Sequence, residues 1–410
     1  MPKPNVECEI CLSGKIEISE LENLEILNNV QKKILSYNSK YFDNDDLYLL
    51  NNSLGLRLRY ENSFWMQTLK YEKRDQSRLE WNSHSCATNI KNPPKLDQMV
   101  LPNTRTLKKS GCILEKDLQS IAHTFDEQFS IEIKRTLWVI NYHGSEVEFT
   151  YDSGLIKTSS KQDKVSEIEL ELVKGKPNTL WILAKYLLKV LPNLCFEYQS
   201  KAFRGFLLNG LDWEKFKPID HLKVIGKSFV FKQFLKETLL LKNKQISFLI
   251  SIITKKNGKK SIPFLIEKVT EIKYIFQFLI ISKIYESKKN QSFYKALRFK
   301  CSTLEKELKI SNDTSFENII FLQNTQILIA DIGLFANSLD SLILKTDVDN
   351  YIRKFFLKIE ESIDKRKKSL NGKEGYKLIK FNSNFFLNLG ISEKTIIENQ
   401  NLDLDLSTFK

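Results

Sequence analysis

Long apolar runs are missing from this sequence of 410 residues. The longest, such as SFLISII and YIFQFLIIS, fall well short of the roughly 18 residues that a membrane-spanning helix needs. The opening stretch, MPKPNVECEI, also lacks the apolar segment that forms the centre of a signal peptide. We therefore expect a cytoplasmic protein that is not inserted in a membrane.

Cysteine is sparse and forms no paired framework. The six cysteines are scattered, and Cys8-x-x-Cys11 is not followed by a second pair with zinc-ligand spacing. In an extended strand Cys8 and Cys11 would point to opposite faces, which argues against one shared metal. The composition shows no collagen-like or disulfide-scaffold bias, so an ordinary globular protein in a reducing compartment is expected.

Arginine is scarce in the second half of the chain, and lysine dominates there. Residues 221–410 contain 33 Lys and Arg against 20 Asp and Glu, whereas residues 1–220 contain 30 of each class. The whole net charge of +13 therefore belongs to the second half. This asymmetry predicts two domains with different electrostatic partners. A solvated, lysine-rich helical surface and a polyanion site explain it equally well.

The first half has the pattern of a β domain. Seven segments rich in β-branched and aromatic residues are predicted strands: residues 54–61, 63–72, 78–85, 129–142, 146–154, 165–175 and 196–208. Two helices are predicted, one over residues 18–37 with Ser19 as its cap and one over residues 176–192. Many strands with few helices indicate a closed or nearly closed antiparallel barrel.

Helical periodicity replaces the β pattern after residue 229. Five helices are predicted, over residues 229–255, 261–286, 293–309, 316–344 and 348–370. Short polar breaks separate them, as in an all-α bundle. We place the boundary near residues 212–225, which gives an α+β protein with one domain over residues 1–212 and a second over residues 225–410.

Charged residues recur at every second position of the predicted strands, which places them on one face. Three acids in a row, Glu167, Glu169 and Glu171, repel one another unless cations lie opposite. Similar spacing or neighbouring strands hold further charges: Glu146, Glu148, Asp152, Arg57, Arg59, Lys70, Arg135, Lys201 and Arg204. The ordinary interpretation is a sheet with its polar face in water. The alternative is a barrel interior with metal and polyanion between acids and cations.

The stretch VECEICL, residues 6–12, brings the same pattern to the N-terminus. In a strand Glu7, Glu9 and Cys11 point the same way, so two acids and a thiol share one face. Carboxylate oxygens suit hard ions such as Mg²⁺ or Mn²⁺, and arginine binds phosphate oxygens in a bidentate manner. Together these residue types favour a site for a metal ion and a phosphate chain.

Nine stretches, in this order, resemble the CYTH domain of the triphosphate tunnel metalloenzymes: VECEICL, YFDNDDLYLL, LGLRLRY, QTLKY, RLEW, FSIEIKRTLWVI, VEFTYDSG, EIELELVKG and SKAFRGF. The resemblance implies an eight-stranded antiparallel β-barrel tunnel that binds Mg²⁺ or Mn²⁺ and a triphosphate. The two-domain layout is similar to bacterial inorganic triphosphatases with a helical CHAD domain. Because this helical half lacks the histidines and arginine-rich helices of CHAD domains, we expect a diverged CHAD-like bundle, mainly structural.

The resemblance also implies roles for individual residues. The implied metal ligands are Glu7, Glu9, Glu167, Glu169 and Glu171, and the implied substrate-binding cations are Arg57, Arg59, Lys70, Arg135, Lys201 and Arg204. The expected catalytic residues among them are Glu7, Glu9, Lys70 and Arg135. Further tunnel residues are expected at Cys11, Glu80, Glu148 and Asp152. Asp152 directly precedes Ser153-Gly154 and fits a turn equally well.

Cys11 occupies the lysine position of the family's Glu-x-Glu-x-Lys signature. A neutral thiol supplies no positive charge to a phosphate, and losing one such donor costs roughly 10²–10³-fold in rate. The predicted function is therefore metal-dependent hydrolysis of inorganic triphosphate to pyrophosphate and phosphate, at a reduced rate.

Three alternatives to this function stay open. The first is a non-catalytic binder of triphosphate or polyphosphate. The second is an enzyme for an organic triphosphate, either thiamine triphosphate or ATP converted to cyclic AMP. Nucleic-acid binding through the basic half is the least favoured, because arginines are not interleaved with aromatic residues there. The sequence does not indicate an oligomeric state.

Overall fold

The computed structural model describes residues 5–61, 63–72, 78–84, 89–90, 92–212, 231–253, 258–282, 288–311, 318 and 322–339. The chain divides into two compact units, Met1–Phe216 and Lys217–Lys410. A β-sheet forms the centre of the first unit and helices form the second, which is the predicted α+β class. No helix in the described ranges is both long enough and apolar enough to cross a membrane.

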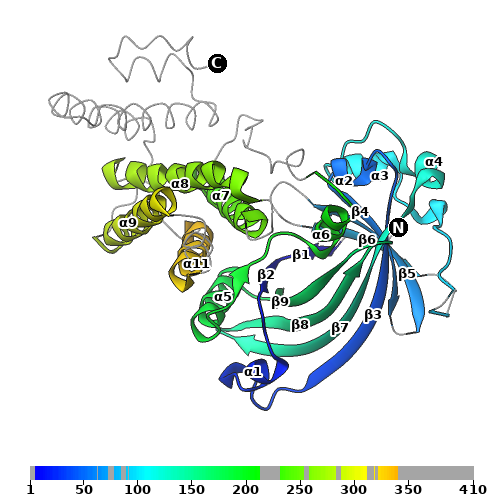
Figure 1. Cartoon of the computed structure of the whole chain (residues 1–410), viewed down its shortest axis with the longest axis horizontal. Helices are drawn as coiled ribbons and strands as arrows, with labels where there is room; N and C mark the ends of the chain where they lie inside the picture. The colour runs from blue at the N-terminus through cyan, green and yellow to red at the C-terminus, as the bar shows by residue number, and fades with distance from the viewer. Residues whose placement is uncertain are drawn as a thin grey trace, which may run out of the picture. The chain divides into compact units, whose positions relative to one another are not determined.

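One antiparallel sheet of ten strands forms the framework of the first unit (Figure 1). The strands are β1 (Asn5–Glu7), β2 (Glu9–Ser13), β3 (Lys32–Asp43), β4 (Leu54–Glu61), β5 (Phe64–Glu72), β6 (Arg78–His84), β7 (Asp126–Tyr142), β8 (Ser145–Lys157), β9 (Gln162–Lys174) and β10 (Cys195–Phe196). Their order across the sheet is β1-β6-β5-β4-β3-β7-β8-β9-β2-β10.

The expected closed barrel of eight strands is corrected by this order, because the hydrogen-bonded sheet has two ends. β1 pairs with β6, where Glu7 lies opposite Arg78, and β2 pairs with β9, where Glu9 lies opposite Glu171. β1 and β2 are consecutive in the chain, with Cys8 alone between them. The interruption at Cys8 thus lets one continuous stretch of backbone pair with β6 through β1 and with β9 through β2.

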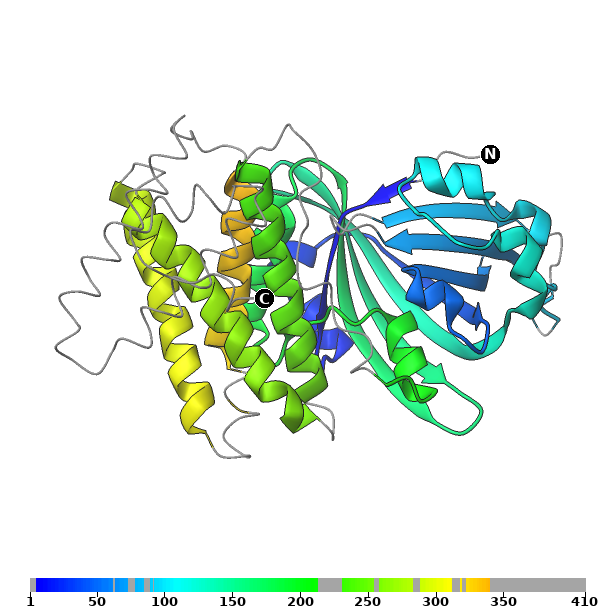
Figure 2. The same ribbon diagram turned by 90° about the horizontal axis from the view of Figure 1, so that it is seen from above.

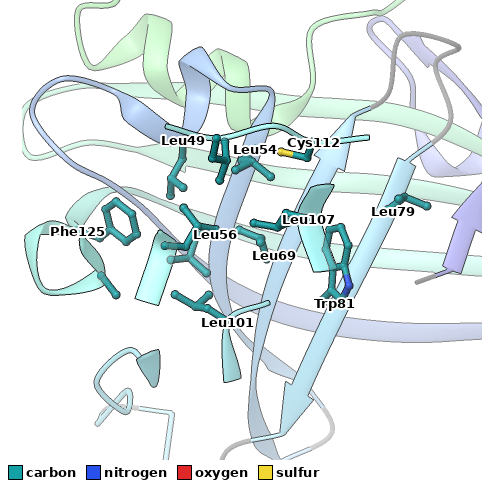
Figure 3. Close-up of a cluster of buried hydrophobic side chains, with 13 residues drawn as sticks. Leu49, Leu54, Leu56, Leu69, Leu79, Trp81, Leu101, Leu107, Cys112 and Phe125 are labelled. Carbon is teal, nitrogen blue, oxygen red and sulfur yellow. The ribbon is translucent and has the colours of Figure 1, made fainter. Parts of the chain in front are cut away.

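Apolar residues at alternate positions bury the outer face of the sheet. Behind β4, β5 and β6, the side chains of Leu54, Leu56, Leu69 and Trp81 are buried in one cluster (Figure 3). Three short helices cover this face: α2 (Tyr48–Asn51), α3 (Thr104–Lys109) and α4 (Leu118–Ile121). Because successive strand residues face opposite sides, this burial directs Arg57 and Arg59 to the inner face.

Helix α5 (Asn178–Val190) covers the outer face at β2 and β9. It lies within the predicted helix and ends one residue before Leu191-Pro192. On β9 the side chains of Ile168 and Leu170 are both fully buried. Their burial fixes Glu167 and Glu169 on the opposite, inner face, as the alternating sequence predicts.

The predicted strand over residues 196–208 is mostly wrong. Only Cys195–Phe196 is a strand, and Lys201–Leu208 form helix α6. Ser200 caps this helix by accepting a hydrogen bond from the Phe203 amide at 3.1 Å. Phe206 of α6 packs with Phe129 and Val165 in a cluster on the inner face of β7 and β9.

The predicted helix over residues 18–37 is also wrong for most of its length. Helix α1 covers only Ile18–Glu22, a 3₁₀ turn covers Glu25–Leu27, and β3 begins at Lys32. Its N-cap is Glu17 rather than the expected Ser19, because Glu17 and Glu20 form a reciprocal capping box. Two further 3₁₀ turns lie at Gln98–Val100 and Ala122–Thr124.

The described part of the second unit is a helical bundle (Figure 2). Its helices are α7 (Phe231–Ile253), α8 (Ile262–Ser282), α9 (Lys288–Ile310) and α11 (Gln323–Ser338), with a 3₁₀ turn at Gly258–Ser261. Buried ion pairs join the helices, with the Lys273 ammonium 2.6 Å from a Glu305 oxygen. The predicted helix over residues 348–370 lies outside the described residues.

Candidate functional site

Three rows of side chains cross the inner face of β7, β8, β9 and β2. In the first row Arg135 lies opposite Asp152, and Asp152 lies opposite Glu167. In the second, Glu169 lies opposite Cys11 on β2. The third row brings together the acids Glu148, Glu171 and Glu9. Residues that lie far apart in the sequence therefore share one surface. We call this surface the acidic wall; it consists of these three rows together with Asp163, at the start of β9.

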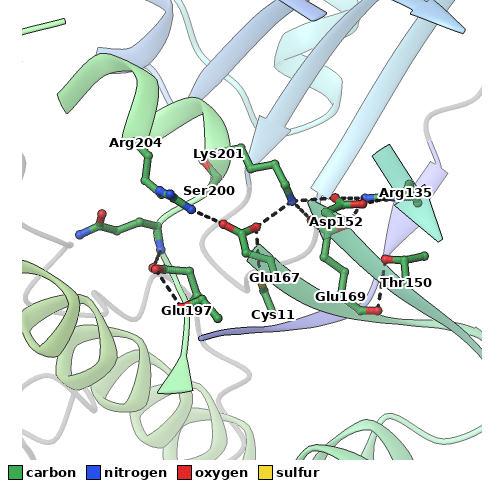
Figure 4. A network of polar contacts seen from close by, with 12 residues as sticks. Cys11, Arg135, Thr150, Asp152, Glu167, Glu169, Glu197, Ser200, Lys201 and Arg204 are labelled. Atoms are coloured by element: carbon green, nitrogen blue, oxygen red, sulfur yellow. Dashed lines mark hydrogen bonds and ion pairs between the residues drawn. The ribbon is translucent and has the colours of Figure 1, made fainter. Parts of the chain in front are cut away.

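Helix α6 brings two cations to the acidic wall. The Lys201 ammonium lies 2.6 Å from Glu169, 2.7 Å from Glu167 and 2.9 Å from Asp152 (Figure 4). Arg204 forms an ion pair with the other oxygen of Glu167, Oε1. The two cations were expected on a strand; a helix instead places residues three apart on one face, so both reach β9.

Arg204 has a second carboxylate partner that sequence reasoning missed. Its Nε and Nη2 atoms donate to Asp163 Oδ2 at 2.9 and 2.7 Å, and Nη2 also donates to the Lys164 carbonyl. Asp163 shares the alternating pattern of Glu167 and Glu169, which was the available signal. Through these bonds Arg204 ties the start of β9 to α6.

Asp152 belongs to strand β8 and is fully buried, so the alternative interpretation as a turn residue is wrong. Arg135 donates to both of its oxygens at 2.6 Å, from Nε and Nη2, in a bidentate pair. Arg135 also forms an ion pair with Glu169. Burial would lower the pKa of Arg135, but Glu169 and Asp152 outweigh it and raise that pKa.

A second surface, the cationic wall, consists of Arg57, Arg59 and Lys70 on β4 and β5. Lys70 forms an ion pair with Glu80 of β6, and an Arg57 nitrogen lies 4.0 Å from the same carboxylate. Burial would raise the pKa of Glu80, but Lys70 and Arg57 prevail and hold it at about 2. Glu80 therefore stays ionised and partly neutralises this wall.

The positive potential of the cationic wall lowers the pKa of Tyr41. Burial would raise the pKa of this phenol, yet Arg57, Arg59 and Lys70 together lower it. The same crowding acts on Arg59, whose pKa is lowered first by burial and then by Arg57. A partly buried surface that disfavours its own cations and favours a nearby negative charge is suited to bind an anion.

Cys11 lies among charged groups but is itself neutral. Its thiol is 3.7 Å from Glu167 Oε2, and burial together with that carboxylate raises its pKa well above the usual range. Burial would lower the pKa of the adjacent Lys201 ammonium, but Glu167, Glu169 and Asp152 outweigh it and raise that pKa strongly. A charged lysine from α6 thus stands beside a neutral residue on β2.

The acidic wall has the donor chemistry for a hard divalent cation. Among described residues, its seven carboxylates outnumber its three cations; the carboxylates belong to Glu9, Glu148, Asp152, Asp163, Glu167, Glu169 and Glu171. One ligand atom each from Cys11, Glu167 and Glu169 lies within 4.8 Å of the others. Oxygen donors of this kind suit Mg²⁺ or Mn²⁺, whereas the Cys11 sulfur does not. Only the backbone position of Glu7, opposite Arg78, is described.

Two tyrosines of β3 on this inner face were missed from the sequence. Tyr37 and Tyr41 are both buried, and Ser39 between them accepts a hydrogen bond from Arg59 Nε at 3.2 Å. Their signal was the alternation Tyr37-Ser39-Tyr41. Because the predicted helix over residues 18–37 included Tyr37, the alternation of β3 was not recognised.

Known proteins match the first part of this chain. The profile of a family described as the CYTH domain matches residues 3–206. A curated relative, the inorganic triphosphatase of Haemophilus influenzae, is 27% identical over 215 residues, which are 51% of this chain and 57% of that protein. The chain thus spans a little over half of the length of this relative.

Solved structures also match, at low similarity. An adenylyl cyclase candidate of Hippeastrum, described as having a dominant triphosphatase activity, is 15% identical with a TM-score of 0.32. The match covers 49% of this chain and 96% of that one. A protein of Pyrococcus horikoshii OT3 is 15% identical with a TM-score of 0.31, over 49% of this chain and 98% of that one.

Proposed function

The chain belongs to the CYTH family through residues 3–206, and from this membership we propose that it hydrolyses inorganic triphosphate to pyrophosphate and phosphate. The observation that carries the proposal is the pairing of two inner surfaces. One holds clustered carboxylates for a divalent cation, and the other holds a buried arginine, Arg57, and a half-buried one, Arg59, for phosphate oxygens. A linear phosphate chain needs this complementarity of charge and no pocket for an organic group.

The cationic wall is the proposed binding site of the phosphate chain. Arg57 and Arg59 offer N–H donors in a planar fork that matches phosphate oxygens, and Lys70 adds a point charge. Arg57 is only 6% exposed, so its charge acts in a medium where water screens it little. The three cations of this wall thus bind and orient the substrate before the reaction.

The acidic wall is the proposed seat of the metal, Mg²⁺ or Mn²⁺. Glu9, Glu167, Glu169 and Glu171 would hold it, with Glu7 as a further ligand by family resemblance. When bound, the ion supplies positive charge to the phosphate oxygens. Lys201 and Arg135, which form ion pairs with Glu169, would then be available to the phosphate chain.

Hydrolysis further requires a water molecule aimed at the terminal phosphorus. A carboxylate of the acidic wall orients that water by accepting its hydrogen bond, while Arg135 and Lys70 stabilise the charge that develops on the phosphate oxygens. The neutral thiol of Cys11 adds no charge, so we propose a slow enzyme. The same residue favours a second candidate, a protein that binds triphosphate or polyphosphate without turnover.

Phosphate release from tripolyphosphate in the presence of Mg²⁺ or Mn²⁺ tests the proposal. We expect release by the full chain and a roughly 10²–10³-fold lower rate in Glu169→Gln. Glu132→Gln is the matched control, because Glu132 is a carboxylate of β7 that pairs with Lys157 on the exposed surface. Binding without release, with either metal, would establish the binder instead.

A substrate panel separates inorganic from organic triphosphates. We expect tripolyphosphate to be preferred over thiamine triphosphate and ATP, since the described contacts of the site are ionic. A preference for either organic substrate, or formation of cyclic AMP, would overturn this assignment while leaving the metal and phosphate sites in place.

A further inference from the structure

Tyr37 lies between the two walls of the interior. It belongs to β3, which pairs with β4 on one side and with β7 on the other. On that strand Ser39 lies opposite Arg59 and Leu35 lies opposite Arg135. Tyr37 is two residues from Ser39 and two residues from Leu35, and all three side chains share one face. Tyr37 is therefore the diagonal neighbour of both arginines.

Both arginines rest on the ring of Tyr37. The guanidinium carbon of Arg59 lies 4.3 Å from the ring centroid, and that of Arg135 lies 5.4 Å from it. Tyr37 is 6% exposed, so water competes little with these cation–π contacts. Such a contact uses the face of the guanidinium and leaves its in-plane N–H groups available to oxygen acceptors.

The hydroxyl of Tyr37 is directed to the acidic wall. It donates to Asp152 Oδ1 at 3.4 Å, the same oxygen that receives the Arg135 Nε hydrogen bond. Ring and hydroxyl together contact Arg59, Arg135 and Asp152, which come from three different strands. Burial and, after it, the nearby Asp152 raise the pKa of Tyr37, so the phenol keeps its proton.

We propose that Tyr37 is a positioning residue that holds the guanidinium groups of Arg59 and Arg135 ready for adjacent phosphates of one chain. The inference rests on the proposed function, because it assumes a phosphate chain between the walls. Tyr37 acts through the two arginines and takes no part in proton transfer. Without the ring, Arg135 keeps only its carboxylate partners and Arg59 loses its stacking contact, so both guanidinium groups are held less firmly. More of their ordering then occurs at the moment of binding, which weakens binding rather than the chemical step.

The test compares Tyr37→Phe with Tyr37→Leu in the full chain. Calorimetry with tripolyphosphate, both with and without Mg²⁺ or Mn²⁺, gives Kd, and phosphate release with either metal gives KM and kcat. Tyr37→Phe keeps the ring and should stay within about twofold of the wild type in Kd. Tyr37→Leu should raise both Kd and KM by roughly tenfold, with little change in kcat.

Tyr151→Leu is the matched control. Tyr151 is equally buried but lies on the outer face of β8, where its hydroxyl donates to the Ile16 carbonyl at 2.9 Å. It should lose stability as Tyr37→Leu does and keep Kd. A series of fluorinated phenylalanines at position 37 preserves the shape, so Kd should rise with each added fluorine even if Tyr37→Leu fails to fold.

The possible results separate this inference from the proposed function. An unchanged Kd in Tyr37→Leu, or a flat fluorine series, overturns the role of Tyr37 even if the enzyme is active. Binding that follows the expected series without any phosphate release supports Tyr37 and defeats hydrolysis. A wild-type chain that does not bind tripolyphosphate overturns both.

Discussion

Cys11 and Lys201 contact the same oxygen atom of Glu167. The Cys11 sulfur lies 3.7 Å and the Lys201 ammonium 2.7 Å from Glu167 Oε2. By family resemblance Cys11 occupies the lysine position of the signature; here it is a neutral thiol, and an ammonium from α6 lies beside it. At this carboxylate oxygen Lys201 supplies the positive charge.

Cys11→Lys should therefore have opposite effects on the free and the loaded protein. Two ammonium groups beside one carboxylate repel each other, so the free variant should unfold at a lower temperature. Tripolyphosphate should recover this loss, and hydrolysis should rise roughly 10²-fold, because one more donor faces the phosphates. Cys11→Ser is the neutral control for both measurements. An unchanged rate in Cys11→Lys would show that Lys201 already supplies the missing charge.

Lys201→Met should reveal the acidic wall as a cation site. The substitution leaves Asp152, Glu167 and Glu169 close together without the ammonium they share, at a cost of roughly 3–5 kcal/mol in the free energy of unfolding. Urea unfolding with and without Mn²⁺ measures it, and Mn²⁺ should restore more stability in the variant than in the wild type. Lys157→Gln, which removes an exposed pair with Glu132, should change stability by less than about 1 kcal/mol and show no added response to Mn²⁺.

Glu80 should make stability depend on acid pH. Its pKa falls from the ordinary 4.5 to about 2 in the folded protein, because Lys70 and Arg57 outweigh the effect of burial. A depressed carboxyl pKa stabilises the folded state fully above about pH 4.5, and the contribution, of the order of 2 kcal/mol, is lost as pH falls toward 2. Unfolding free energies across this range should decline less steeply in Glu80→Gln. Parallel curves for variant and wild type would contradict the assignment.

Gly205→Ala should displace helix α6 from the sheet. A Cβ atom at this position would lie 2.2 Å from the ring of Phe129, which is 2% exposed and cannot withdraw. We expect a loss of roughly 1–3 kcal/mol in unfolding free energy and weaker tripolyphosphate binding, since Lys201 and Arg204 move with the helix. At Gly55 a Cβ would meet nothing within 4 Å, so Gly55→Ala should keep the wild-type stability.

The strands of the first unit were predictable where alternation was strong. In β4, β8 and β9 the charged positions alternate with buried apolar residues, so the register and the inner face follow from the sequence. β3 was not predictable, because the apolar residues before it fit a helical period as well. α6 was not predictable either, because its aromatic residues suggest a strand until Phe129 and Val165 are known to lie against it.

The candidate site followed the same division. Charges spaced by two residues were found from the sequence, including Arg57, Arg59, Glu167 and Glu169. Partners that depend on the crossing of distant elements were not, such as Asp163 with Arg204 and Tyr37 with Arg59. Local alternation shows which face a residue takes, whereas the neighbour across the interior depends on the order of all strands.

The junction at Cys8 has a consequence for how this protein is made. β2 is synthesised well before β9, so Glu9 must wait for Glu171 before it can pair. Pairing across so long a separation is slow, and until it happens the edges of β6 and β9 stay exposed to other chains. A bulky fusion at the N-terminus should therefore hinder both edges at once and yield a full-length chain that aggregates.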